Sequence, residues 1–338
     1  MLDIEAYFPA AQAALQAFGM ASAALAPVSM SENAVFRVTD TAGAIFALRL
    51  HRPGYHARDA LDSERMLTAM LAAKGMIVPT GQRTSDGAWY AAIATPDPEG
   101  WRHAGLTVWH EGHTLESRIG EDRGPATWHW FESAGALLAE LHTHTESWSP
   151  TPGFVRHRLD MEGLVGEAPF WGRFWQAQSL NVDERQMLGT ARDLARARLT
   201  ELARAELARG NAPFGLIHAD AHPGNILISG SESHSRLGLI DFDDCAWGWH
   251  AFDMAVALRS ASGKPRFKEL RDRFLAGYET RRALPGGILQ QLDLFLLVRA
   301  LTLVIWCEMR PDVVGESPEE SWKPGLLDDI RQAMGAVA

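Results

Sequence analysis

The chain has 338 residues, of which 46% are hydrophobic and 22% are charged, a balance typical of a globular protein with a substantial apolar core. Its formal net charge of −10 argues against a dedicated nucleic-acid binder and against docking on anionic membranes. Two cysteines are too few for a disulfide scaffold or a cysteine zinc site, which favours a reducing, cytoplasmic compartment.

Two segments could be mistaken for membrane-directed sequence. Residues 1–18 carry Asp3 and Glu5 where a signal peptide would have basic residues, so we expect an opening helix. The apolar stretch 292–307 is interrupted by Arg299 and is shorter than the roughly 20 residues that span a bilayer. We therefore predict a buried helix there and no contact with a membrane.

The first third of the chain has the patterns of strands and one helix. Residues 34–39 (AVFRVT) and 45–50 (IFALRL) are separated by the turn-prone DTAG and predict a hairpin. Apolar positions of residues 59–73 share one helical face. Residues 89–94 and 106–110 add two further strands. The order β-β-α-β-β predicts a small α+β unit.

The rest of the chain is predicted to be mainly helical, apart from an insert with strand character at residues 215–240. No extended Gly/Ser linker is present, so we expect a tight hinge near residue 107 and domains of residues 1–107 and 108–338. The helices that periodicity predicts are 126–141, 183–209, 251–260, 266–278 and 288–309.

The chemistry is predicted to reside in two segments, LIHADAHPGNILI (216–228) and LGLIDFDD (237–244). Short apolar strands bracket their polar side chains, and a polar group there costs free energy unless a hydrogen bond or a metal satisfies it. Asp220, Asn225 and Asp241 offer hard oxygen atoms of the kind that Mg²⁺ prefers. A hairpin would bring the three side chains to one edge. The alternative, a turn-rich pair of strands, leaves the apolar bracketing and the clustered acids unexplained.

These segments resemble the motifs of the aminoglycoside phosphotransferase and choline kinase family, a branch of the protein-kinase-like fold. HADAHPGN matches H-x-D-x-x-x-x-N, and IDFDD stands where kinases have D-F-G. The resemblance covers nearly the whole chain. It implies a bilobal α+β fold with a small β-rich N-lobe over residues 1–107 and a mainly helical C-lobe over residues 108–338.

The resemblance also implies roles for individual residues. Asp220 would be the catalytic group that accepts the proton of the substrate hydroxyl, and Asn225 and Asp241 would bind Mg²⁺. His218 and Asp253 would brace the catalytic loop without taking part in the chemistry. Asp243 would reach either a second metal or the substrate, and the sequence does not choose between these two roles.

The nucleotide end departs from the usual kinase pattern. Strand 45–50 carries Arg49 where a lysine is normal; we interpret it as a phosphate contact, with Glu64 of the following helix as its partner. The alternative is an exposed strand arginine and a solvated helix glutamate. No G-x-G-x-x-G loop is present, so Ser29, Ser31 and Asn33 are candidate phosphate contacts, with a simple polar turn as the alternative.

The hinge candidate is residues 107–115, TVWHEGHTL. The resemblance places adenine against backbone groups near Val108 and His110. Backbone recognition leaves little trace in side chains, so preference for ATP over GTP cannot be read from the sequence.

The predicted activity is ATP- and Mg²⁺-dependent transfer of the γ-phosphate to a hydroxyl of a small molecule, such as an amino alcohol, a sugar or a hydroxy amino acid. The acceptor is then the expected partner, with no nucleic acid and no membrane, and with either a monomer or a weak dimer. Two alternatives remain open: a bacterial Ser/Thr protein kinase of the same fold, and a nucleotide-binding scaffold with little turnover, which Arg49 and the missing glycine loop motivate.

Overall fold

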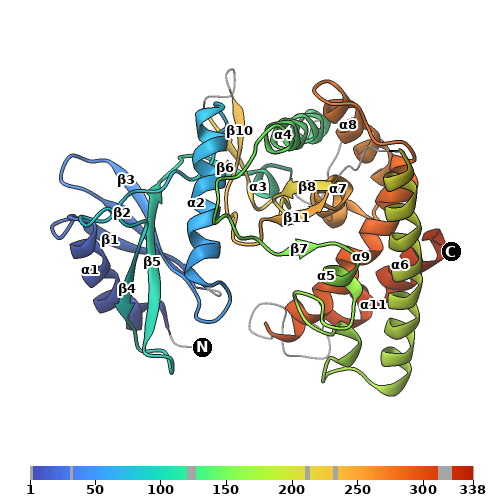
Figure 1. Ribbon diagram of the computed structural model, residues 1–338, viewed down its shortest axis with the longest axis horizontal. Helices are drawn as coiled ribbons and strands as arrows, with labels where there is room; N and C mark the ends of the chain where they lie inside the picture. Colours follow the sequence, from blue (N-terminus) through green and yellow to red (C-terminus); the bar gives the residue numbers. More distant parts are fainter. Residues whose placement is uncertain are drawn as a thin grey trace. The chain divides into compact units, whose positions relative to one another are not determined.

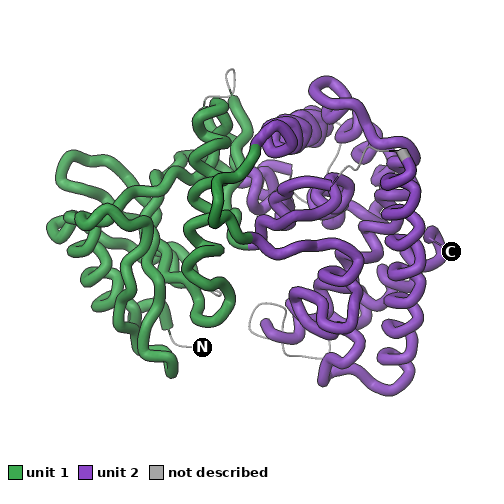
Figure 2. The backbone as a smooth tube through the Cα atoms, in the orientation of Figure 1, with its two compact units in different colours: residues 1–113, 149–155, 227–243 green, residues 114–148, 156–226, 244–338 purple. Residues whose placement is uncertain are grey.

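The computed structural model describes residues 3–30, 33–119, 127–209, 214–230, 235–310 and 322–337. The packing of the backbone divides the chain into two compact units (Figure 2). Unit 1 comprises residues 1–113, 149–155 and 227–243, and unit 2 comprises residues 114–148, 156–226 and 244–338. The division into lobes at residues 107 and 108 stays a prediction, because the packing of the chain divides it elsewhere.

Unit 1 contains a five-stranded antiparallel sheet with the order β1-β2-β3-β5-β4 (Figure 1). The predicted hairpin is confirmed, because β2 and β3 have the predicted bounds and pair in register from Ala34–Leu50 to Thr39–Ile45. The strands are β1 (Ala24–Met30), β2 (Ala34–Thr39), β3 (Ile45–Leu50), β4 (Tyr90–Ala94) and β5 (Trp101–Val108).

The sequence did not predict strand β1. It contains Pro27, which lacks an amide hydrogen, and most of its residues are exposed, so it shows no alternation of buried and exposed positions. The structure places β1 at the edge of the sheet, where a proline is tolerated, and the pairing with β2 shifts register between Pro27 and Ser29.

Helices complete the core of unit 1. The predicted opening helix is confirmed as η1 (Ile4–Tyr7) followed by α1 (Phe8–Ala17), and the predicted second helix as α2 (Arg58–Ala73). Small side chains such as Ala11 and Ala14 let α1 approach the sheet, where they join the fully buried Phe36, Leu48 and Leu106. This packing gives the central strand β3, which carries Arg49, a rigid support.

A second sheet has the order β10-β9-β6, with β6 (His113–Thr114), β9 (Ile226–Ser229) and β10 (Arg236–Leu239). Neighbouring β9 and β10 confirm the hairpin that was predicted between the two motif segments. Asn225 directly precedes β9, and Asp241 follows the last residue of β10 by two positions.

Unit 2 is mainly helical and includes one small sheet with the order β7-β11-β8. The five predicted helices are confirmed as α4, α6, α7, α8 and α9, whereas α11 and β11 were not predicted. The elements are α3 (Leu115–Ile119), α4 (Trp128–Glu146), β7 (Arg158–Leu159), α5 (Met161–Val165), η3 (Phe174–Gln176), α6 (Val182–Arg209), β8 (Phe214–Ile217), β11 (Ala246–Trp249), α7 (His250–Leu258), η4 (Arg259–Ala261), α8 (Phe267–Glu279), α9 (Ile288–Glu308) and α11 (Trp322–Val337).

Helix α9 is long and apolar enough to cross a membrane by length and composition, yet 61% of its most apolar window is buried inside the protein. Phe295, Leu297 and Leu301 on this helix are fully buried. The expectation of a buried core helix is thus confirmed.

Helices α4 and α8 cross very closely. A methyl group at Gly135 would overlap the carbonyl oxygen of Phe274, and one at Gly277 would overlap the carbonyl oxygen of Glu132. The two glycines therefore permit a backbone approach that a larger residue would prevent.

Candidate active site

The catalytic-loop candidate runs from His218 to Asn225, between strands β8 and β9 of the chain. Ala219 has a φ of 66°, in the left-handed region that a residue with a Cβ rarely adopts. The buried carboxylate of Asp253 on α7 holds this turn, since it accepts the backbone N–H groups of His218 at 2.9 Å and Ala219 at 2.6 Å. The predicted bracing role of Asp253 is confirmed.

Asp253 is itself part of a buried hydrogen-bonded chain. His142 Nε2 lies 3.1 Å from its carboxylate, and His142 Nδ1 lies 2.9 Å from the hydroxyl of Tyr278. Burial lowers the pKa of His142 to about 3, so the ring is neutral at pH 7 and has one hydrogen. Because the carboxylate can only accept, the hydrogen lies on Nε2 and Nδ1 accepts from Tyr278. Burial also raises the pKa of Asp253 to about 6.

His218 also stabilises the loop, as predicted. Its side chain is fully buried, and Nδ1 accepts the backbone N–H of Asp220 at 3.3 Å. The loop geometry around Asp220 is therefore fixed by contacts on both sides of Ala219.

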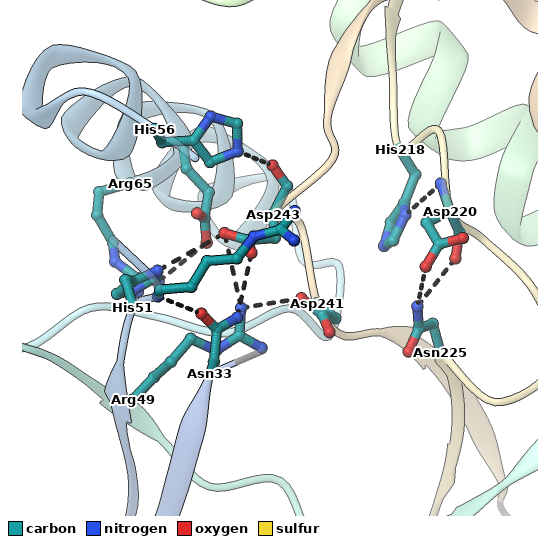
Figure 3. A network of polar contacts seen from close by, with 12 residues as sticks. Asn33, Arg49, His51, His56, Arg65, His218, Asp220, Asn225, Asp241 and Asp243 are labelled. Carbon is teal, nitrogen blue, oxygen red and sulfur yellow. Dashed lines mark hydrogen bonds and ion pairs between the residues drawn. The ribbon is translucent and has the colours of Figure 1, made fainter. Parts of the chain in front are cut away.

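Both carboxylate oxygens of Asp220 have partners within unit 2. Asn225 Nδ2 donates to Oδ2 at 3.1 Å and to the backbone oxygen of Asp220 at 2.9 Å (Figure 3). Arg299 Nη2 donates to Oδ1 at 2.5 Å. The Asp220 side chain nevertheless keeps 23% of its surface exposed, so it can be reached from outside the protein.

Arg299 is the residue of this group that the sequence analysis did not assign to the site. The signal was present, because an arginine that interrupts the apolar helix α9 must find a carboxylate or solvent for its charge. Its partner could not be identified from the sequence, since Asp220 lies 79 positions away.

The two ends of the Asn225 amide differ in their contacts. Its nitrogen is used by Asp220, whereas its oxygen Oδ1 has no hydrogen-bond donor among the described residues. An amide oxygen that accepts no hydrogen bond from the protein is a suitable ligand for a hard divalent cation.

The other proposed ligand, Asp241, lies in unit 1 and adopts a φ of 63°, a left-handed conformation that aspartate tolerates better than most residues. Its Oδ1 accepts from Arg49 Nη1 at 2.9 Å (Figure 3). Burial opposes the charge of Arg49, but the carboxylates of Asp241, Asp243 and Glu64 outweigh it and raise the arginine pKa above its ordinary value. Arg49 is therefore permanently charged.

The expected partnership between Arg49 and Glu64 needs a correction. Among the described residues the ion-pair partners of Arg49 are Asp241 and, at 4.0 Å, Asp243, and the nearest cation to Glu64 is Arg65 at 3.6 Å. Glu64 is buried and acts on Arg49 through its charge without touching it. The sequence correctly predicted that Glu64 lies on the helix after the strand. It could not show that Asp241 lies closer to Arg49 than Glu64 does.

Asn33 also differs from its predicted role, because both ends of its side chain are used inside unit 1. Nδ2 donates to Asp243 Oδ2 at 3.1 Å, and Oδ1 accepts the backbone N–H of Arg52 at 2.8 Å. This buried side chain is not available to a phosphate. Of the other two candidates in the turn, Ser29 lies in β1 and Ser31 lies outside the described residues.

Asp243 is buried and held by the same part of unit 1. His51 Nδ1 lies 3.6 Å from its Oδ1, and His56 Nε2 lies 2.6 Å from its backbone oxygen. Although burial opposes ionisation, the hydrogen bond from His51 and the charge of Arg49 hold the Asp243 pKa well below its ordinary value. Asp243 thus anchors the segment that carries Asp241, a role that differs from the two predicted ones.

The predicted adenine contacts lie at the end of β5. The backbone N–H of Val108 already donates to the oxygen of Thr80 at 2.9 Å, and His110 Nε2 lies 2.9 Å from the oxygen of Val78. A purine at this segment must therefore use backbone groups other than the Val108 amide. The contact at Val108 and His110 stays a prediction.

The donor chemistry of Asn225 and Asp241 fits Mg²⁺. The amide oxygen of Asn225 in unit 2 and the carboxylate of Asp241 in unit 1 are each a hard oxygen donor that would suit Mg²⁺, which would offset phosphate charge. Within the part of the chain that the structure describes, no cluster of three or more His, Cys, Asp or Glu side chains could hold a metal. The binding of Mg²⁺ by Asn225 and Asp241 stays a prediction.

Comparisons with known proteins agree on the family. The family model described as "Phosphotransferase enzyme family" matches residues 25–287. A solved microcompartment-associated aminopropanol kinase is 28% identical, with a TM-score of 0.75, and the match covers 97% of this chain and 94% of that one. A homoserine kinase of Sinorhizobium fredii is 31% identical over 231 residues, which are 68% of this chain and 60% of the relative.

A third similar protein, the amicoumacin kinase hAmiN, was solved in complex with AMP-PNP, Ca²⁺ and Ami. Its identity to this chain is 19% and its TM-score is 0.69, with 92% of this chain and 88% of the other covered, so it supports the fold alone.

The predicted protein-kinase-like fold, with a β-rich N-terminal region followed by a mainly helical C-terminal region, is confirmed. The predicted reaction class, phosphate transfer to the hydroxyl of a small molecule, is also confirmed. It leaves open whether the acceptor is an amino alcohol, a sugar or a hydroxy amino acid. Because the family model covers more than half of its length, this chain belongs to the phosphotransferase enzyme family and is an ATP-dependent kinase of small-molecule hydroxyl groups.

Proposed function

We propose that the chain transfers the γ-phosphate of ATP, with Mg²⁺, to the hydroxyl of a small acceptor, and that Asp220 accepts the hydroxyl proton. The observation that carries this assignment is the loop geometry of unit 2. A left-handed turn at Ala219, held by Asp253, presents a partly accessible carboxylate whose position is fixed by Asn225 and Arg299.

The reaction needs little covalent participation by the protein. The acceptor oxygen forms a bond to the γ-phosphorus as the bond from that phosphorus to the bridging oxygen of ADP breaks, and the hydroxyl proton passes to Asp220. Asn225 and Asp241 are the residues that would hold the metal, which would offset the phosphate charge. Arg49 is proposed to contact the phosphates in place of the usual lysine, supported by its permanently charged guanidinium, whose side chain is 20% exposed.

Three further features are proposed: the chemistry of the acceptor, the position of the adenine and the cellular compartment. The names of the similar aminopropanol and homoserine kinases support an acceptor that carries an amino group as well as a hydroxyl. The adenine is proposed to lie against the backbone of residues 108–110. A cytoplasmic location is supported by Cys245 and Cys307, which are both buried and free.

The test is ADP release from Mg²⁺–ATP with a panel of small amino alcohols, hydroxy amino acids and sugars. We expect Asp220→Asn to lower kcat by about 10²- to 10⁴-fold, because the proton acceptor is lost while shape is kept. Asp293→Asn is the matched control, since Asp293 is a partly buried carboxylate of α9 whose pKa burial already raises. Turnover that survives Asp220→Asn would contradict the proposal.

A further inference from the structure

Arg299 offers more hydrogen-bonding capacity than its contact with Asp220 uses. Its side chain is 11% exposed, and only Nη2 is engaged, with Asp220 Oδ1 at 2.5 Å. The other guanidinium N–H groups have no partner among the described residues, and none of them is sealed off from solvent. A guanidinium carries its donors in a rigid fork, so the unused ones point from a fixed position beside Asp220.

The charge of this pair determines which acceptor can lie next to it. Asp220 alone would attract an ammonium group, as the acidic composition of the chain also would. Arg299 places a permanent positive charge within hydrogen-bonding distance of that carboxylate. This charge offsets the negative charge of Asp220 and repels an ammonium group that approaches the guanidinium. A carboxylate at the same place meets a complementary, bidentate donor.

We propose that Arg299 binds a carboxylate of the acceptor and so selects a short hydroxy acid over the amino alcohol that lacks that carboxylate. The inference rests on the proposed function, because it takes Asp220 as the group that receives the hydroxyl. Among the acceptor classes left open above, it favours hydroxy amino acids.

The geometry also limits the length of this acceptor. Its hydroxyl must reach Asp220 while its carboxylate lies on the fork of Arg299, and the two protein groups are in direct contact. Only a few bonds can therefore separate the hydroxyl from the carboxylate. An acceptor in which many bonds separate the two groups would have to fold back on itself to reach both residues, which costs conformational entropy.

Two substrate pairs test the inference, because each pair differs by one carboxylate. L-Serine is compared with ethanolamine, and L-homoserine with 3-amino-1-propanol, by ADP release with Mg²⁺–ATP. The wild-type chain is expected to have a kcat/KM at least about tenfold higher for the member with the carboxylate in one of the pairs.

Arg299→Gln is expected to lower kcat/KM for both members of the pair, because Asp220 loses a partner, and to lower it about 10- to 100-fold further for the hydroxy amino acid, which also loses its carboxylate contact. The additional loss is expected mainly in KM. Arg299→Lys keeps the charge but loses the fork, and an intermediate loss is expected. Arg259→Gln is the matched control, since Arg259 is similarly enclosed in unit 2 and pairs with Asp329 at 2.7 Å away from this loop. Thermal unfolding of the variants shows whether each is folded.

Equal losses for both members of a pair would overturn the inference, because they would mean that Arg299 only positions Asp220. Asp220-dependent turnover confined to the amino alcohols or to sugars would also overturn it and would leave the proposed function standing. Absence of Asp220-dependent ADP release with every compound of the panel would overturn both.

Discussion

At the residue scale, the amide of Asn225 combines one contact that the structure shows, with Asp220, and one that we propose, with Mg²⁺. Its amide nitrogen fixes Asp220, and its amide oxygen stays open for a cation. The two functions separate chemically, because hydrogen-bond donation needs the nitrogen and metal binding needs the oxygen. A substitution at this position should therefore disturb both the position of Asp220 and the affinity for Mg²⁺.

Asn225→Ala is expected to raise the Mg²⁺ concentration that gives half-maximal activity by at least about tenfold, and to lower kcat as well. A titration of ADP release against Mg²⁺ at saturating ATP measures both effects. Asn181→Ala is the control, because Asn181 accepts the backbone N–H of Glu184 at the start of α6 and has no place in the site. An unchanged Mg²⁺ requirement would remove Asn225 from the metal site.

At the scale of elements, the close crossing of α4 and α8 supports the catalytic loop from a distance. Helix α4 supplies His142, which contacts Asp253, and α8 supplies Tyr278, which contacts His142. The separation of the two helices is set by Gly135 and Gly277. The position of the loop therefore depends on two residues that have no functional group.

Gly277→Ala is expected to destabilise the protein by more than about 2 kcal/mol, because the added methyl group forces α8 away from the carbonyl of Glu132. Activity per folded molecule should fall too, since Tyr278 follows directly in the chain. Urea unfolding and ADP release give the two quantities. Gly189 in α6 has open space around its Cα, so Gly189→Ala should stabilise the protein by about 0.5–1 kcal/mol. A similar loss of stability for both substitutions would refute this explanation.

The sequence predicted elements better than contacts. Strands β2 and β3 were predicted with correct bounds because alternation and a turn are local signals, whereas edge strand β1 with Pro27 gives no such signal. The motif residues of the loop were predicted, but the contact of Arg49 with Asp241 joins residues 192 positions apart. No local sequence pattern could show that Asn33 donates a hydrogen bond to Asp243, since 210 positions separate the two residues.

At the scale of the whole molecule, buried titratable groups in unit 2 predict acid sensitivity. Burial lowers the pKa of His142 to about 3 and that of His250 well below its ordinary value. Below pH 6.5 the unfolded chain protonates both rings and the folded protein does not, so stability falls as the pH falls. Asp253, whose pKa is raised to about 6, acts in the opposite direction, because the folded state takes up its proton first.

The net loss between pH 7.5 and pH 5.5 is expected to be about 2 kcal/mol, because the two histidines together outweigh the opposing contribution of Asp253. Urea unfolding at the two pH values measures it. His250→Met should remove about half of the histidine contribution, since both ring nitrogens of His250 are buried without a hydrogen-bond partner. A pH dependence unaltered by this substitution would contradict the assignment.

Unit 1 is assembled from three stretches of chain, and the last of them ends at residue 243. During synthesis the ribosome must therefore deliver more than two thirds of the polypeptide before Asn33, Arg49 and His51 can meet the aspartates that neutralise and anchor them. A fragment cut after residue 113 would keep every strand of the five-stranded sheet and still leave Arg49 without its two ion-pair partners and the Asn33 amide nitrogen without its acceptor. Dissection of this enzyme into separately expressed halves at that position should fail for this reason.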